Sequence, residues 1–77
     1  MSQVKFTKGS EEWSMFMDYW ALCQKYWEPD NEDDYWNALA REANAFYKKY
    51  GTDFSKELAL AIINEAERKW KEKNGKE

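Results

Sequence analysis

The sequence predicts an all-α fold, a three-helix bundle with short loops and a short N-terminal arm. Three stretches carry apolar residues at the three- and four-residue spacing of a helix, and breakers separate them at Pro29 and Gly51. The chain has 77 residues, enough for one domain with one small hydrophobic core. We therefore expect a single helical domain over residues 1–77, with an arm at 1–9, helices near 11–27, 32–50 and 53–73, and a frayed tail at 74–77.

The first predicted helix is unusually rich in large aromatic residues. It begins after Ser10, a favourable N-cap, with Glu11 and Glu12 in its first turn. Its apolar residues cover roughly 220° of the helix circumference and form two neighbouring stripes. The first stripe repeats a tryptophan every seven residues and contains Trp13, Phe16, Met17, Trp20, Cys23 and Trp27. The second stripe contains Met15, Tyr19, Leu22 and Tyr26.

The boundaries of the second and third helices follow from their capping residues. Asp30 or Asn31 can cap the second helix, because short polar side chains accept hydrogen bonds from the first free backbone N–H groups. Gly51 can end this helix in a left-handed conformation. Thr52 or Asp53 can then cap the third helix.

Two neighbouring helices can cover about 200° of the first helix, so we expect most of its tryptophan stripe to be core. The expected core contains Phe16, Trp20, Cys23, Trp36, Leu39, Ala43, Phe46, Leu58, Ile62 and Ile63. A small bundle packs poorly around so many rings, so we expect Tyr19, Tyr26, Trp13 and Trp27 to stay partly exposed. Such rings are typical of binding interfaces. The predicted partner-binding residues are Trp13, Met15, Tyr19, Leu22, Tyr26 and Trp27.

The net charge of -3 gives no general reason to bind nucleic acid, and the aromatic residues lie beside acids rather than bases. We therefore do not expect direct nucleic-acid binding. The acids gather at one corner, formed by Glu28, Asp30, Glu32, Asp33 and Asp34. Helix capping accounts for most of them. A calcium loop of the EF-hand type fails at Tyr35, where glycine is needed, and at Arg41, where glutamate is needed.

Catalysis is not expected. The chain has no histidine, and its lone Cys23 lies in an aromatic stripe without a base to activate it. We expect no cofactor and no bound metal. The single cysteine excludes an intrachain disulfide, and no stretch is apolar enough to cross a membrane, so we expect a cytoplasmic protein.

Several stretches resemble a known group of proteins: residues 9–13 (GSEEW), 19–27 (YWALCQKYW), 46–51 (FYKKYG) and 58–61 (LALA). Over residues 9–64 the chain looks like small uncharacterised proteins encoded by phages and prophages of Firmicutes. The charged tail after Asn64 matches no consistent pattern in that group. No functional residue carries over. The resemblance implies binding of a host protein in the host cytoplasm, including components of antiviral defence.

The expected function is therefore a small non-enzymatic protein–protein interaction module. It would be a phage-encoded inhibitor or adaptor that binds a host protein through the aromatic surface of its first helix. Two alternatives remain open. The same surface can join copies of the chain in a structural homo-oligomer, or the acidic corner can mimic DNA and inhibit a nucleic-acid enzyme.

Overall fold

The computed structural model describes residues 4–74, and three helices contain most of them. Helix α1 spans Glu11–Lys25, α2 spans Asp33–Tyr50 and α3 spans Asp53–Asn74. No strand occurs between residues 4 and 74. The predicted all-α fold is confirmed, and each helix boundary lies within two residues of the expected position. Of the predicted frayed tail, Asn74 is still helical, whereas 75–77 lie outside the described residues, as do residues 1–3 of the arm.

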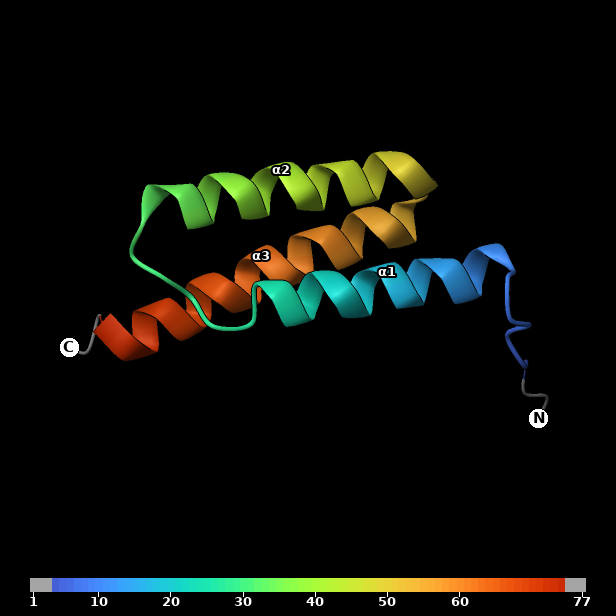
Figure 1. Ribbon diagram of the computed structural model, residues 1–77, viewed down its shortest axis with the longest axis horizontal. Helices are drawn as coiled ribbons and strands as arrows, with labels where there is room; N and C mark the ends of the chain where they lie inside the picture. Colours follow the sequence, from blue (N-terminus) through green and yellow to red (C-terminus); the bar gives the residue numbers. More distant parts are fainter. Residues whose placement is uncertain (1–3, 75–77) are drawn as a thin grey trace.

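Helices α2 and α3 form a closely packed pair, and α1 lies against both of them (Figure 1). The contact between α2 and α3 is far more extensive than the contact of α1 with either helix. The bundle is elongated, with extents of 46 × 28 × 20 Å, and the N-terminal arm and the end of α3 lie at opposite ends of its long axis. This arrangement leaves one side of α1 without a covering helix.

Hydrogen bonds confirm the predicted start of α1 and the predicted end of α2. The hydroxyl of Ser10 accepts a hydrogen bond from the backbone N–H of Trp13 at 3.3 Å, which caps α1. Gly51 ends α2 with φ 62°, and its N–H donates to the carbonyl of Tyr47 at 2.7 Å. Only glycine adopts this left-handed conformation without strain, so Gly51 fixes the sharp turn into α3.

The caps of α2 and α3 differ in quality. Thr52 and Ser55 form a reciprocal pair, in which each hydroxyl accepts the other residue's backbone N–H, at 3.0 and 3.1 Å. The predicted cap of α2 at Asp30 or Asn31 is wrong. The cap residue is Glu32, and its side chain makes no capping bond. Asp30 accepts the backbone N–H of Glu32 at 3.0 Å, outside the first turn of the helix.

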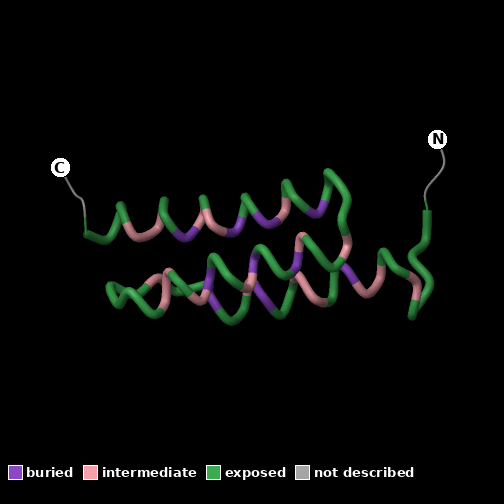
Figure 2. The backbone as a smooth tube through the Cα atoms, turned by 90° about the horizontal axis from the view of Figure 1, so that it is seen from above, coloured by how far each residue is buried: buried purple, intermediate pink, exposed green. Residues whose placement is uncertain are grey.

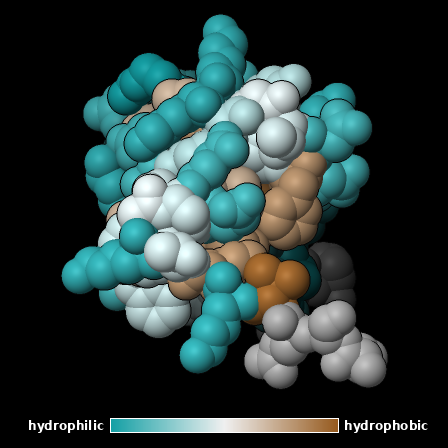
Figure 3. All heavy atoms as spheres, turned by 90° about the vertical axis from the view of Figure 1, so that its right-hand side faces the viewer, coloured by the Kyte–Doolittle hydropathy of each residue, from teal (hydrophilic) through white to brown (hydrophobic). Residues whose placement is uncertain are grey.

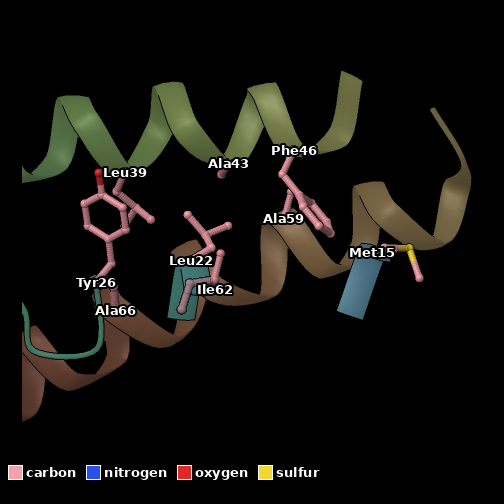
Figure 4. Packing of buried hydrophobic residues seen from close by; sticks show 9 residues of the cluster. All are labelled: Met15, Leu22, Tyr26, Leu39, Ala43, Phe46, Ala59, Ile62 and Ala66. Atoms are coloured by element: carbon pink, nitrogen blue, oxygen red, sulfur yellow. The ribbon is translucent and has the colours of Figure 1, made fainter. Parts of the chain in front are cut away.

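The core lies along the common axis of the three helices, where buried positions turn toward the interior (Figure 2). Alanines Ala43, Ala59 and Ala66 let α2 and α3 approach closely, and Leu39 and Ile62 fill the space between them. Figure 4 shows side chains of all three helices converging on this space. The buried apolar residues are Met15, Leu22, Tyr26, Leu39, Ala43, Phe46, Ala59, Ile62 and Ala66.

The orientation of α1 is the opposite of the expected one. Its second stripe faces the core, with Met15, Leu22 and Tyr26 buried. Phe16 and Trp20, which were expected in the core, are exposed. The remaining expected core residues are correctly placed or half-buried: Leu39, Ala43, Phe46 and Ile62 are buried, and Cys23, Trp36, Leu58 and Ile63 are half-buried.

Candidate protein-binding surface

The exposed side of α1 and the segments beside it carry six exposed large apolar side chains, which we call the aromatic face. Trp20 lies near its centre and is 64% exposed, the highest value among the large apolar residues of α1. Its indole N–H makes no hydrogen bond to any residue between 4 and 74. The other members come from α1, the loop that follows it, the N-terminal arm and the start of α3. The aromatic face comprises Phe6, Phe16, Met17, Trp20, Trp27 and Phe54.

At one end of the aromatic face, three phenylalanines from three segments of the chain contact one another. Phe6 of the arm stacks on Phe16, with ring centroids 5.4 Å apart and an interplanar angle of 17°. Phe54 of α3 meets the same ring edge to face at 6.0 Å. Phe6 of the arm therefore packs onto α1. Figure 3 shows this end of the molecule, where brown apolar surface interrupts the teal polar surface.

At the other end, a lysine of α3 holds Trp27 in place. The ammonium nitrogen of Lys69 lies 3.4 Å from the centre of the Trp27 ring and donates a hydrogen bond to the Trp27 carbonyl at 3.0 Å. A cation over an indole face is an attractive contact. Trp27 is therefore ordered while it remains 49% exposed.

Two groups of three side chains fix the rotation of α1 against α2. In the Glu42 triad, the Glu42 carboxylate accepts hydrogen bonds from Lys25 and from the hydroxyl of Tyr26, both at 2.7 Å. The ring of Tyr26 rises from α1 toward α2 beside Leu39 (Figure 4). Its hydroxyl therefore crosses the helix interface and reaches the carboxylate.

The Asp18 triad repeats this arrangement about two turns earlier in α1, with the donors and the acceptor exchanged between the helices. Here the carboxylate belongs to α1, and Lys49 and the hydroxyl of Tyr50 in α2 both donate to Asp18. Hydrogen bonds lower the pKa of both carboxylates. The bond from Lys49 contributes most at Asp18, and the bond from Lys25 contributes most at Glu42. A groove of about 370 Å³ between α1 and α2 separates the triads.

Three of the six predicted partner-binding residues cannot contact a partner in this structure. Met15, Leu22 and Tyr26 are buried against α2 and α3. Trp13 and Tyr19 are half-buried, and Trp27 alone is clearly exposed.

Five residues of the aromatic face were absent from the predicted binding set: Phe6, Phe16, Met17, Trp20 and Phe54. For the members in α1, the available signal was the seven-residue repeat of tryptophan, which marks one side of a helix. No signal near Phe6 or Phe54 in sequence indicated that both would meet Phe16. That contact exists because the arm and α3 come together beside α1.

The acidic corner lies in the loop before α2 and in its first turn, with its five acids all exposed: Glu28, Asp30, Glu32, Asp33 and Asp34. Its backbone is tied down by two indoles. Trp36 donates to the carbonyl of Asp30 at 2.8 Å, and Trp70 donates to the side chain of Asn31 at 2.6 Å. Lys73 and Asp30 line the same shallow pocket, so a positive charge lies beside the acids.

The groups best suited to nucleophilic chemistry are poorly activated. Burial raises the pKa of the Cys23 thiol, and burial also raises the pKa of the neighbouring Tyr19 to about 12. Between residues 4 and 74 no three His, Cys, Asp or Glu side chains are grouped so as to hold a metal ion. In the same stretch, no helix combines the length and the apolar character that crossing a membrane requires.

Comparison with known proteins identifies no relative of this chain. No protein-family model matches the chain, and neither a curated protein nor a solved structure is significantly similar to it.

Proposed function

We propose that this protein is a non-catalytic binding module that contacts another protein chain through the aromatic face. The observation that carries this proposal is the exposure of six large apolar residues on one side of α1 and beside it. With about 150–250 Å² for each large side chain, their exposed fractions amount to roughly 600 Å². That is at the upper end of the largest apolar patch on a typical monomer, and patches of this size mark interaction sites.

The composition and order of the face also support binding. Helix α1 already supplies the core from its opposite side, through Met15 and Leu22, so the exposed rings add little to the core. Trp27 and Phe16 are held by Lys69 and Phe6, which reduces the entropy lost when a partner binds. Tryptophan is also the residue that most often dominates binding energy at interfaces.

The nature of the bound chain has separate support. A host protein, including one of antiviral defence, rests on the resemblance to phage and prophage proteins alone. The acidic DNA mimic has less support from the geometry, because Lys73 lies beside the acidic corner and Asp30 is engaged in the loop's own hydrogen bonds. We therefore propose the aromatic face, rather than the acidic corner, as the site of binding.

Site-specific photo-cross-linking in cells tests this proposal. A benzophenone amino acid at Met17, which is exposed on the face, should give protein adducts of defined mass. The Trp20→Ser change should remove these adducts, because it takes the central ring from the face. The control is the same amino acid at Lys48, an exposed position on α2 away from the face. Equal adducts from positions 17 and 48, or none from 17, would overturn the proposal.

A further inference from the structure

Independently of the aromatic face, we infer a second binding site, a pocket between the start of α2 and the end of α3 that takes an arginine side chain of a protein partner. Both segments lie at the end of the bundle away from the N-terminal arm (Figure 1). The pocket has a volume of about 330 Å³ and is lined by Trp36, Glu67, Trp70 and Lys71. Three features lead to this ligand: the two indole rings, the carboxylate of Glu67 and the surrounding charges.

The two indoles of the pocket are held in place by the loop before α2. The N–H of Trp36 donates to the carbonyl of Asp30 at 2.8 Å, and the N–H of Trp70 donates to the side-chain oxygen of Asn31 at 2.6 Å. Each ring thus has its only polar group paired with the loop, and both residues are half-buried. The rings present π surface to the pocket, which attracts cationic groups. Because both rings are fixed beforehand, a ligand loses little binding energy in ordering them.

The carboxylate of Glu67 gives the pocket a preference for a cation that donates hydrogen bonds. Glu67 is exposed and forms no ion pair with any residue between 4 and 74. A guanidinium group stacks flat on an indole and can donate two parallel hydrogen bonds to one carboxylate. A lysine ammonium is instead a compact, strongly hydrated charge. Two indoles beside one carboxylate therefore fit arginine better than lysine.

Of the four bases in the last turns of α3, two are already engaged within the bundle. Lys69 lies over the Trp27 ring, and Arg68 is paired with two glutamates of its own helix. Lys71 lines the pocket, and Lys73 lines the neighbouring one beside the loop. The ammonium of Lys71 opposes a bound cation, so removing this charge should strengthen binding.

The acids at this end of the molecule outnumber the two remaining lysines. The loop that holds both indoles belongs to the acidic corner, and four acids of that corner form no ion pair within the described part of the chain: Glu28, Glu32, Asp33 and Asp34. Glu67 adds a fifth. Their combined field attracts a basic segment of a partner and speeds its association. The acidic corner thus supplies long-range attraction, whereas the two indoles and Glu67 form the pocket that selects arginine.

Nuclear magnetic resonance titration of the full chain with synthetic peptides tests the ligand. The probes are short peptides in which glycine alternates with arginine, with lysine or with citrulline, which has the shape of arginine without its charge. The arginine peptide should shift the indole N–H signals of Trp36 and Trp70, assigned through Trp36→Phe and Trp70→Phe. It should bind on the order of fivefold more tightly than the lysine peptide, and the citrulline peptide should leave both signals in place.

Two results of this titration would overturn the inference. Equal affinity for the arginine and lysine peptides would mean that the acidic corner alone attracts them. Unshifted signals of Trp36 and Trp70 at saturation would mean that the peptide binds elsewhere.

Charge variants of α3 test the role of the carboxylate. Glu67→Gln should weaken the arginine peptide at least about fivefold, because it removes the charged acceptor, and Lys71→Gln should strengthen it several-fold. Glu57→Gln is the matched control, since it removes the same charge from an exposed position of α3 about 15 Å along the helix. It should change the affinity less than about twofold. Equal losses from Glu67→Gln and Glu57→Gln would show that net charge alone decides binding and would exclude the pocket.

A variant of the aromatic face separates the two sites. Trp20→Ser, which should remove the cross-links from Met17, should leave the affinity for the arginine peptide unchanged, because Trp20 does not line the pocket. A loss of peptide binding in Trp20→Ser would place the peptide on the aromatic face and overturn the pocket as its site.

Discussion

At the scale of single residues, the tyrosines and tryptophans of α1 have separate roles because only the tyrosines carry a hydroxyl at the far end of the ring. Tyr26 is 4% exposed, and its hydroxyl still has a hydrogen-bond partner because it donates to the Glu42 carboxylate on the neighbouring helix. Trp20 has its polar N–H on the side of the ring and finds no acceptor within residues 4–74. The polar end of a buried ring must be paired, and α2 offers a carboxylate in reach of tyrosine.

The two triads predict an acid-sensitive stability. The pKa values of Asp18 and Glu42 lie below their ordinary values of 3.8 and 4.5 in the folded chain. The folded state therefore binds fewer protons than the unfolded state, and the free energy of unfolding falls as the pH decreases from about 5 through these pKa values. Urea unfolding followed by circular dichroism at a series of pH values should show the midpoint decreasing steadily over that range.

The control for acid sensitivity is the double variant Asp18→Asn/Glu42→Gln. It should be less stable than the wild type at neutral pH and should lose less stability on acidification. Some dependence should remain, because Arg68 also lowers the pKa of Glu65. An unchanged slope in the double variant would show that the triads do not couple protonation to folding.

At the scale of the element, α1 is apolar on two sides, and its contacts with α2 select the side that is buried. The Glu42 triad holds the C-terminal end of α1 through Lys25 and Tyr26, and the Asp18 triad holds the middle of the same helix. A rotation that buried the tryptophans instead would break both triads and leave two carboxylates unpaired. The helix itself was predictable from its spacing and its Ser10 cap, whereas its rotation depends on partners 16 and 32 residues away in sequence.

A pair of alanine variants checks the rotation of α1. Leu22→Ala should lower the free energy of unfolding by about 2–4 kcal/mol, because it opens a cavity in the core. Trp20→Ala removes a larger side chain but should change that free energy by less than about 0.5 kcal/mol, because the ring is mostly in water. Urea unfolding at a concentration where the chain is monomeric makes the comparison. The reverse order would mean that the tryptophan stripe is the buried one.

At the scale of the whole molecule, α2 and α3 form the closer pair and α1 is the third, more loosely attached helix. Alanines along α2 and α3 bring their backbones together, while α1 contacts them through Met15, Leu22 and Tyr26. Segments with fewer buried contacts open at a lower free energy than the rest of a fold. The bundle should therefore open first at α1.

Native-state hydrogen exchange checks this order of opening. Amides in the middle of α1 should exchange faster than those in the middle of α2 and α3, with a difference in protection of about tenfold or more. Uniform protection in all three helices at low concentration would show that α1 is as firmly held as the other two.

The sequence by itself determined the class of the fold, the number of helices and nearly all of their boundaries. These features depend on neighbours in the chain: the cap at Ser10, the left-handed turn at Gly51 and the pair Thr52–Ser55. It also indicated that α1 has more aromatic surface than one small core needs. Each of these features is local, and local spacing is what a sequence displays directly.

Only the tertiary structure decided which stripe of α1 is core and which is surface. Both stripes have helical spacing and similar apolar content, so their burial depends on what α2 and α3 place opposite them. Glu42 accepts from Tyr26, and Lys49 and Tyr50 donate to Asp18, so these polar partners in α2 fix the rotation. Trp20 and Trp27 then remain exposed, and Phe6, Phe54 and Lys69 reach the same side from distant parts of the chain.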